Sequence, residues 1–480
     1  MKSLLFSFLL AVCLQAAGQT LDALASTPAR VLKADEVLPS LNAEQKAIID
    51  QMPKTPQFAR VFDYGWIETP EDWSQPDSRR IRIFYMRLKA NPQTPSLPPA
   101  IYFNGGPGMC LGPGSALNLM GRDPQRDFIV IHQRGTGCSS PFPEASDEAS
   151  IRRLAHYLSS DIVKDSEALR RSLYGDKTAW AVVGQSFGSF IGHRYLELAP
   201  ASITSLHLHG VAPSQNAALW PELRLRSHGA LLKQFLIRQP EGARRLKLIR
   251  QHLQKNPSAF TVAGLTCKGE HMLGLVGLLH LTPDGKSLDN LLRRLCPKDQ
   301  VNEKELIATV RQVNIDVLNF HRPSGTLNII FNRLEGYGAG RQSLSAFYQG
   351  LFQKLAAEGD DPRLWLIGEE ALAHNSLSSP AFHLADTLDF GPAKSLDPKK
   401  IAANLREHPS ITFRLYSGEF DTISPPAAYQ DMQKTCGQGL IYTLIPNSDH
   451  GGFMADQPFW QDLRRQTAAA LPIETFNPQK

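Results

Sequence analysis

Residues 184–188 have the sequence GQSFG and match the pattern G-x-S-x-G. This pattern is typical of a sharp turn between a strand and a helix, which presents its serine at the carboxyl edge of a sheet. Glycines flank the serine because side chains there would collide with neighbouring backbone. An apolar run precedes the motif, and a run compatible with a helix, residues 189–196, follows it. We therefore predict that Ser186 is a nucleophile; the alternative is an ordinary strand–helix turn.

A serine hydroxyl needs a base to take its proton and an acid to orient that base. In proteins with this kind of turn, an acid and then a histidine follow the serine along the chain. Asp421 and His450 both come shortly after a β-rich run. We predict Asp421 as the orienting acid and His450 as the general base, with Glu419 and Asp449 as nearby alternatives for the acid.

Acyl transfer also needs two N–H donors for the negative oxygen that forms in its tetrahedral intermediate. The residue after the nucleophile, Phe187, is expected to supply one donor. The sequence GGPG at residues 105–108 is expected to supply the other, from Gly106 first and Gly105 second. The alternative for this loop is a turn that merely ends a strand.

Most of the other histidines are expected to be surface or core residues. His132, His207 and His209 stand beside predicted strand ends and could line a pocket near the serine.

The elements that must position these residues are short apolar runs separated by glycine-rich turns. Continuous apolar runs of this length are typical of buried parallel strands, and active sites gather at the carboxyl ends of such strands. The predicted strands are residues 64–70, 80–87, 100–103, 128–131, 180–183, 203–209, 411–416 and 440–445. A long stretch with an amphipathic helical pattern lies between the predicted strands at 203–209 and 411–416. The sequence therefore predicts an α/β fold with a mostly helical insertion after the sixth strand region.

The N-terminus has the pattern of a signal peptide: Lys2, an apolar run at residues 4–12, and small residues before Gln19. We expect cleavage before Gln19 and export, either to a periplasm or out of the cell. No later apolar run approaches the ~20 residues of a membrane span, so no transmembrane segment is expected after cleavage.

Composition argues against several other classes. The net charge of +5 comes from 51 basic and 46 acidic residues without a long basic block, which gives no support for nucleic-acid binding. The cysteines and histidines lack the spacing of a metal site, so neither a metal nor another cofactor is expected.

Cys267 and Cys296 are the favoured disulfide pair. The oligomeric state does not follow from the sequence.

Taken together, GGPG at 105–108, QRGTG at 133–137, GQSFG at 184–188 and the loops around Asp421 and His450 resemble the proline iminopeptidase and tripeptidyl aminopeptidase family of α/β-hydrolases. The resemblance covers roughly residues 60–215 and 400–460 and implies an α/β-hydrolase fold with a mostly helical cap. The expected organisation is a signal peptide at 1–18, an N-terminal arm at 19–57, the core at 58–213 and 401–480, and the cap at 214–400.

The resemblance implies cleavage of one or a few residues from the N-termini of peptides, often with proline preferred at the scissile position. It also implies that an acidic cap residue holds the substrate's free α-amine. Glu369 and Glu370 are the first candidates here and Glu335 is the third; the alternative is a solvated helix face. Two positions depart from the family: His132 replaces a common Asp, and Ser189 stands where a second Gly is common.

Two other functions remain open from the sequence. The same machinery suits a carboxylesterase or lipase-like enzyme, since a fold does not determine its substrate. A non-catalytic binding protein is a weaker alternative, because all three types of catalytic residue are present. An epoxide hydrolase or dehalogenase is disfavoured, since those use a carboxylate nucleophile.

Overall fold

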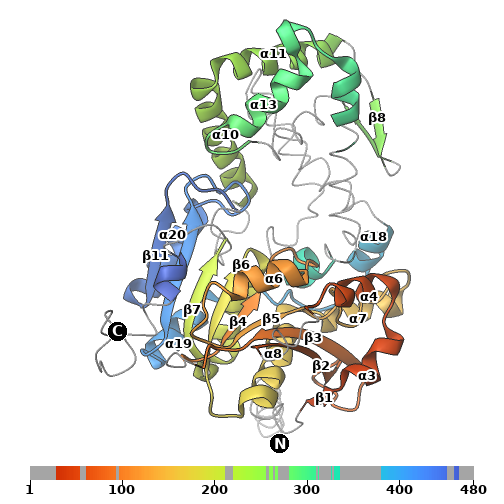
Figure 1. Ribbon diagram of the computed structural model, residues 1–480, viewed down its shortest axis with the longest axis vertical. Helices are drawn as coiled ribbons and strands as arrows, with labels where there is room; N and C mark the ends of the chain where they lie inside the picture. Colours follow the sequence, from red (N-terminus) through yellow and green to blue (C-terminus); the bar gives the residue numbers. More distant parts are fainter. Residues whose placement is uncertain are drawn as a thin grey trace, which may run out of the picture.

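A computed structural model describes residues 29–53, 61–92, 97–210, 220–255, 259–262, 265–268, 281–309, 312, 326, 329–335, 380–450 and 459–463. Its centre is a nine-stranded sheet in the order β1-β2-β3-β5-β4-β6-β7-β10-β11 (Figure 1). The strands are β1 (Arg30–Leu32), β2 (Phe62–Pro70), β3 (Arg80–Leu88), β4 (Ala100–Phe103), β5 (Phe128–Ile131), β6 (Trp180–Gln185), β7 (Ile203–His209), β10 (Thr412–Gly418) and β11 (Leu440–Ile445).

The sheet is antiparallel at one edge and parallel through the rest. β1, β2, β3 and β5 pair antiparallel in that order. From β5 onward, the strands β5, β4, β6, β7, β10 and β11 pair parallel in that order. β4 and β5 are buried along their whole length, as expected for apolar strands of a parallel sheet that is covered on both faces.

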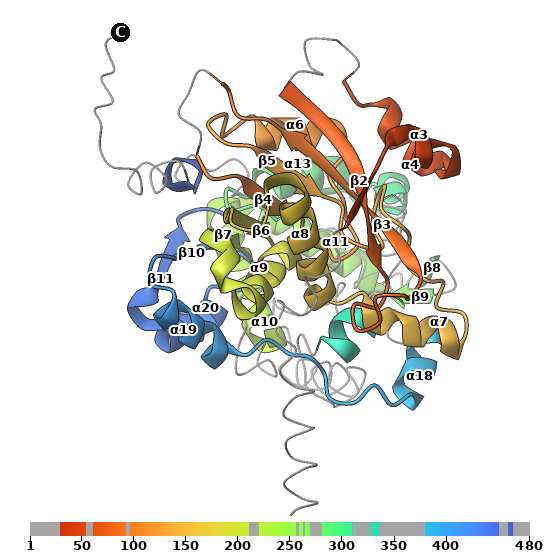
Figure 2. The same ribbon diagram turned by 90° about the horizontal axis from the view of Figure 1, so that it is seen from below.

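Helices cover both faces of the sheet. One apolar cluster joins one sheet face to α8 (Ser159–Tyr174), α9 (Phe187–Leu198), α19 (Pro398–Glu407) and α20 (Ala427–Cys436). A second cluster joins the other face to α3 (Ala34–Val37), α4 (Ala43–Asp50), α6 (Pro113–Met120) and the helical residues 459–463. Figure 2 shows α3 and α4 beside the antiparallel edge of the sheet, with α19 and α20 at the opposite edge.

The order of the strands reverses next to β4. The chain passes from β4 to β5 on one side, then crosses back to β6 on the other side and continues outward to β7. Ligands of open α/β sheets bind outside the carboxyl ends of the strands at such a reversal. This point lies between the loop after β4 and the turn after β6, where the sequence places GGPG and Ser186.

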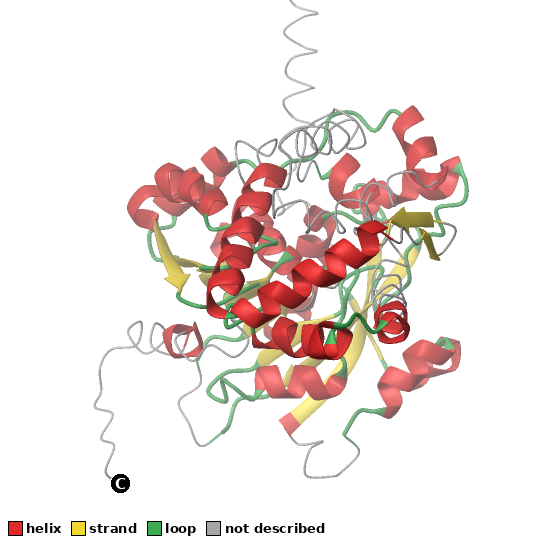
Figure 3. Ribbon diagram, turned by 90° about the horizontal axis from the view of Figure 1, so that it is seen from above, coloured by secondary structure: helices red, strands yellow, loops and turns green. Residues whose placement is uncertain are grey.

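The segment between β7 and β10 contains mostly helices among its described residues. They are α10 (Trp220–Arg238), α11 (Pro240–Lys255), α13 (Lys286–Leu295), the π-helical turn η6 (Ile329–Leu334) and α18 (Pro380–Thr387), with a small antiparallel hairpin of β8 (Ala259–Val262) and β9 (Leu265–Lys268). Leucines of α10, α11 and α13 form an apolar core of their own. Figure 1 shows these three helices above the carboxyl edge of the sheet. In the view from above in Figure 3, helices lie in front of the strands.

Every predicted strand of the sheet is confirmed. β1, in the predicted N-terminal arm, was not expected; it is only three residues long and pairs with β2 through its backbone. α7 (Glu148–Arg153) completes the helices of the core. The domain boundaries drawn from the sequence stay predictions, and the proposed signal peptide lies outside the described residues.

Two further observations concern the described part of the chain. None of its helices has the length and apolar character that crossing a membrane requires. Cys296 is a free, buried thiol, so the predicted pairing of Cys267 with Cys296 is wrong.

Candidate active site

Ser186 lies on the turn between β6 and α9, in a backbone conformation that non-glycine residues rarely adopt. Its φ is 54° and its ψ is −122°, a region that costs about 1–3 kcal/mol and is typical of functional turns. The flanking glycines are required by space: a Cβ added at Gly184 would lie 2.3 Å from Gly188 O, and one at Gly188 would lie 1.9 Å from Phe103 O. The turn therefore holds the serine at the edge of the sheet, as predicted from the motif.

His450 and Asp421 are in direct contact. The Nδ1 atom of His450 lies 2.8 Å from Oδ2 of Asp421, whose side chain is fully buried. The other carboxylate oxygen accepts the backbone N–H groups of Ile423, at 2.9 Å, and Ser424, at 2.6 Å. Glu419, one alternative acid, is exposed and accepts the Asn447 N–H instead. The structure thus brings Asp421, the predicted acid, to the predicted base.

Gly210 lies between the base and the nucleophile. A Cβ added there would lie 2.8 Å from Cε1 of His450 and 3.3 Å from the backbone N of Ser186. Its φ is +95°, a conformation that favours glycine. The sequence showed only that a glycine ends the strand β7. In the fold this glycine leaves the space in which the histidine ring lies beside the Ser186 turn.

The loop after β4 packs against the same turn. A Cβ added at Gly105 would lie 2.9 Å from the Cβ of Ser186 and 3.6 Å from its Oγ. Beneath the loop, the Tyr102 hydroxyl donates to Oε1 of Gln185 at 3.1 Å. Gly106, with φ +116°, is the next residue, and Phe187 begins α9 directly after the serine. The residue after Ser186 and the loop that packs against Ser186 therefore carry the two predicted N–H donors.

The register of the sheet explains how residues so far apart in sequence meet. Phe103 pairs with Gly184, Gln185 pairs with His209, and Gly418 pairs with Ile445. The strands therefore end at one level. The loops that carry Ser186, the predicted oxyanion glycines, the predicted acid and the predicted base leave the same edge.

Helices of the segment between β7 and β10 contact the loop of Asp421. The Ser227 hydroxyl on α10 donates to the backbone O of Asp421 at 2.9 Å. The neighbouring Phe420 is buried in the apolar core that α10, α11 and α13 form. Asp421 is thus fixed from α10 as well as from its own loop.

Of the three histidines considered for the pocket, only His209 adjoins one of the predicted catalytic residues, His450. Its ring centroid lies 6.0 Å from that of His450, and burial, followed by the nearby His450, holds the pKa of His209 well below its usual value. His207 is fully buried beside Tyr416, and burial lowers the pKa of His207 to about 3. His132 is also fully buried and lies beneath the loop after β4.

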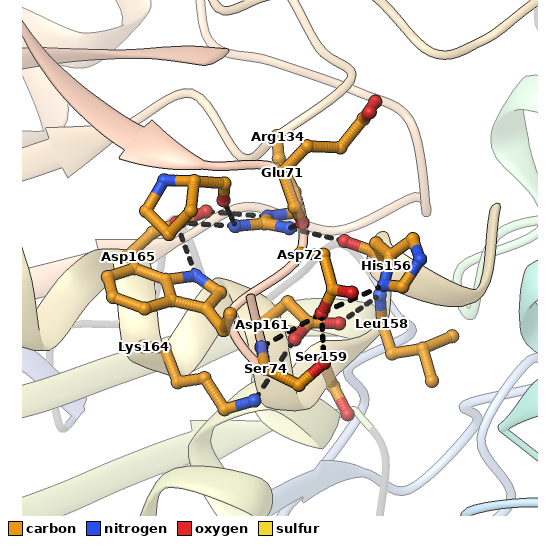
Figure 4. A network of polar contacts seen from close by, with 12 residues as sticks. Glu71, Asp72, Ser74, Arg134, His156, Leu158, Ser159, Asp161, Lys164 and Asp165 are labelled. Atoms are coloured by element: carbon orange, nitrogen blue, oxygen red, sulfur yellow. Dashed lines mark hydrogen bonds and ion pairs between the residues drawn. The ribbon is translucent and has the colours of Figure 1, made fainter. Parts of the chain in front are cut away.

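The side chain of Arg134, in the QRGTG motif, has no exposed surface for a substrate. Figure 4 shows this side chain within a network of polar contacts. Its guanidinium donates twice to Asp165, at 2.7 and 2.6 Å, and Trp73 donates to the same carboxylate at 3.1 Å. It also donates to the backbone oxygens of Glu71 and His156. One side chain thereby joins the loop after β5, the loop after β2 and helix α8.

Of the three acids predicted to bind the substrate's α-amine, the structure describes one. Glu369 and Glu370 lie outside the described residues. Glu335 is 1% exposed, accepts hydrogen bonds from the N–H and hydroxyl of Ser159, and pairs with Arg194 at 3.4 Å. Burial raises the pKa of the Glu335 carboxyl, although Arg194 opposes that rise. Its oxygens are engaged with the core, an arrangement that the sequence did not reveal because the partners are 141 and 176 residues away.

This chain is similar to several known proteins. A family model described as "alpha/beta hydrolase fold" matches residues 98–237. The proline iminopeptidase aneH of Aspergillus aculeatus is 28% identical over 44% of this chain and 51% of its own length. The proline iminopeptidase of Aeromonas sobria is 35% identical over 31% of this chain and 37% of its own length. A solved proline iminopeptidase of Mycobacterium smegmatis aligns with 85% of this chain and 100% of its own, at 15% identity and a TM-score of 0.36.

The matches to the two sequence relatives span about half of their length or less. The strand order, the serine turn and the family model nevertheless agree with one another. This chain has the α/β-hydrolase fold, and its sequence is similar to those of proline iminopeptidases.

Proposed function

We propose that the chain is a serine aminopeptidase in which Ser186 is the nucleophile, His450 the general base and Asp421 the acid that orients it. The observation that carries this proposal is the 2.8 Å contact between His450 Nδ1 and Asp421 Oδ2, beside a strained serine turn. The carboxylate oxygen of Asp421 accepts a hydrogen bond from Nδ1 of His450, so Nδ1 carries the hydrogen. Nε2 of the neutral imidazole carries none and is free to take a proton.

The reaction follows from these roles. Ser186 Oγ attacks the scissile carbonyl while His450 takes its proton, and the oxygen that becomes negative is bound by the N–H groups of Phe187 and Gly106. His450 then gives the proton to the leaving amine, and the acyl group stays on Ser186. A water molecule, activated by the same histidine, hydrolyses the ester and restores the serine.

The substrate class rests on the resemblance in sequence rather than on the geometry. Two sequence relatives are named proline iminopeptidases, which supports a peptide with a free N-terminus. Glu369 and Glu370 remain the proposed partners of its α-amine, since a carboxylate beside a pocket favours a bound ammonium and disfavours a blocked one. Glu335 already has two partners in the core, so it is not proposed for this role.

A panel of chromogenic substrates tests the proposal. Aminoacyl and tripeptidyl anilides, each free and N-acetylated, should be cleaved only in the free form and only by the protein that retains Ser186. Equal cleavage of free and acetylated substrates would contradict the aminopeptidase assignment. Turnover of short esters without any turnover of peptides would identify an esterase instead.

We also propose that the chain is exported after removal of residues 1–18. The apolar run at residues 4–12, after Lys2, supports this. N-terminal sequencing of the protein recovered outside the cytoplasm should begin at Gln19. Recovery in the cytoplasm with Met1 or Lys2 still present would contradict export.

A further inference from the structure

The loop that carries the oxyanion glycines has few means of holding itself in place. Residues 104–111 follow β4 and lead toward α6, and we call them the oxyanion loop. Three of these eight residues, at positions 105, 106 and 108, are glycines, which have no side chain with which to anchor the backbone. Yet this backbone packs so close to Ser186 that a Cβ added at Gly105 would lie 2.9 Å from the serine Cβ. Its position must therefore be set by contacts from outside.

Two adjacent side chains after β5 contact the two ends of the oxyanion loop. Nε2 of Gln133 donates to the backbone O of Asn104 at 2.9 Å. Nε2 of His132 lies 2.9 Å from the backbone O of Leu111. His132 has no exposed surface and Gln133 has 2%, so both bonds form away from water, where an unpaired group is costly.

The hydrogen bonds of His132 fix which of its nitrogens carries the hydrogen. The backbone N–H of Cys138 donates to Nδ1 at 3.0 Å, so Nδ1 is the acceptor and carries none. Nε2 must then carry the hydrogen and donate it to Leu111 O. Burial lowers the pKa of His132 to about 4, so this neutral form persists at neutral pH.

The residues around the His132 ring leave room for these hydrogen bonds and hold the ring in place. A Cβ added at Gly137 would lie 2.3 Å from Nδ1 of His132, and Gly137 has φ +51°. The glycine lets the backbone of the QRGTG loop approach the ring closely enough for the Cys138 N–H to reach it. Phe84 packs against the imidazole with its centroid at 4.8 Å, which limits its rotation.

We propose that His132 is a positioning residue for the oxyanion hole, because it ties the oxyanion loop at Leu111 to the QRGTG loop at Cys138. This inference rests on the proposed acyl-transfer function. The oxyanion contact forms only as the carbonyl becomes tetrahedral, so a displaced loop lowers kcat and leaves KM nearly unchanged. A residue that only fills the core would change stability without that separation.

Two amide variants of His132 test its two ring hydrogen bonds separately. In His132→Gln the side-chain amide reaches as far as Nε2 and can still donate to Leu111 O. In His132→Asn it reaches only as far as Nδ1, so the bond to Leu111 is lost. The proposal predicts that Gln retains kcat within about threefold, whereas Asn loses about tenfold to a hundredfold in kcat with KM within about twofold of wild type.

His207→Phe is the matched control for the loss of a buried histidine. His207 is equally buried, and neither of its ring nitrogens has a hydrogen-bond partner among the described residues. We expect this variant to change the unfolding temperature but to keep the wild-type kcat. The comparison of Gln with Asn remains decisive if a larger change prevents folding, because both variants are polar and differ by one methylene.

The measurement is steady-state kinetics of the full chain with a free aminoacyl anilide and with p-nitrophenyl acetate, alongside Ser186→Ala. Wild-type kcat in His132→Asn, or equal losses in the Gln and Asn variants, would overturn the role of His132. If Ser186→Ala retained turnover, the proposed function itself would fail. The two failures are therefore distinguishable.

Discussion

Nδ1 of His450 lies 2.8 Å from Oδ2 of Asp421, and that carboxylate has no exposed surface. The contact joins two loops that are 29 residues apart in sequence and leave neighbouring strands, β10 and β11. Since Ile423 and Ser424 donate to the other oxygen, the carboxylate has little freedom to turn. The histidine ring is thereby held in one tautomer and one orientation beside Ser186.

Asp421→Asn should preserve this geometry but reverse the direction of the central bond. The amide would present N–H to Nδ1, so the hydrogen of His450 would move to Nε2 and the base would be lost. We expect kcat to fall by roughly 10³–10⁴-fold, with the unfolding temperature changed by only a few degrees. Glu419→Gln, on an exposed carboxylate of the same loop, is the matched control and should keep kcat; an active Asp421→Asn would contradict the triad.

Gly188→Ala should prevent or strongly weaken folding. Its Cβ would lie 1.9 Å from Phe103 O, which is backbone and cannot rotate away, so we expect a loss of about 3 kcal/mol or more in the free energy of unfolding. Gly114→Ala in α6 has nothing within 4 Å of its Cβ and should be neutral or stabilising by up to about 1 kcal/mol. Urea unfolding of both variants measures the contrast. Equal stabilities would show that the turn does not have this crowded geometry.

The Arg134–Asp165 pair should show strong coupling. Arg134→Leu leaves a buried carboxylate without its partner and should cost about 3–5 kcal/mol. Asp165→Leu should cost a similar amount, and the double variant should cost much less than the two single changes added together. The check is a double-mutant cycle from urea unfolding. Additive losses would indicate that the pair does not act as a unit.

Stability should fall as the pH is lowered below about 6.5, because buried histidines resist protonation. Burial lowers the pKa of His132 and of His193 to about 4 and that of His207 to about 3, and the pKa of His209 also lies well below its usual value. Between these values and about 6.5 the unfolded chain binds more protons than the folded one. Each such histidine therefore removes up to about 1.4 kcal/mol per pH unit as the pH falls.

The free energy of unfolding measured between pH 7 and pH 5 tests this sign. In His207→Phe the slope of the free energy of unfolding against pH should decrease by the equivalent of about one proton, because one buried histidine has been removed. A stability that stays constant, or increases, from pH 7 to pH 5 would show that these histidines are not buried as neutral groups.

The sequence predicted the parts of the site that depend on local rules. The Ser186 turn follows from flanking glycines, and Asp421 and His450 follow from their positions after apolar strands. The roles of Gly210 and His132 were not predicted, because each depends on which loop lies opposite in the folded sheet. Glu335 was considered as a binding residue because an acid is visible in sequence, whereas its buried partners Ser159 and Arg194 are not.

The most direct test of the central claim is covalent labelling of Ser186. After treatment with a fluorophosphonate, peptide mass spectrometry should place a single adduct on Ser186, with none on Ser186→Ala and labelling at least about a hundredfold slower for His450→Ala. Cleavage of a free aminoacyl anilide should be lost in parallel with labelling. A folded wild-type protein that cleaves the anilide while Ser186 stays unlabelled, or that is labelled equally fast without His450, would contradict the account.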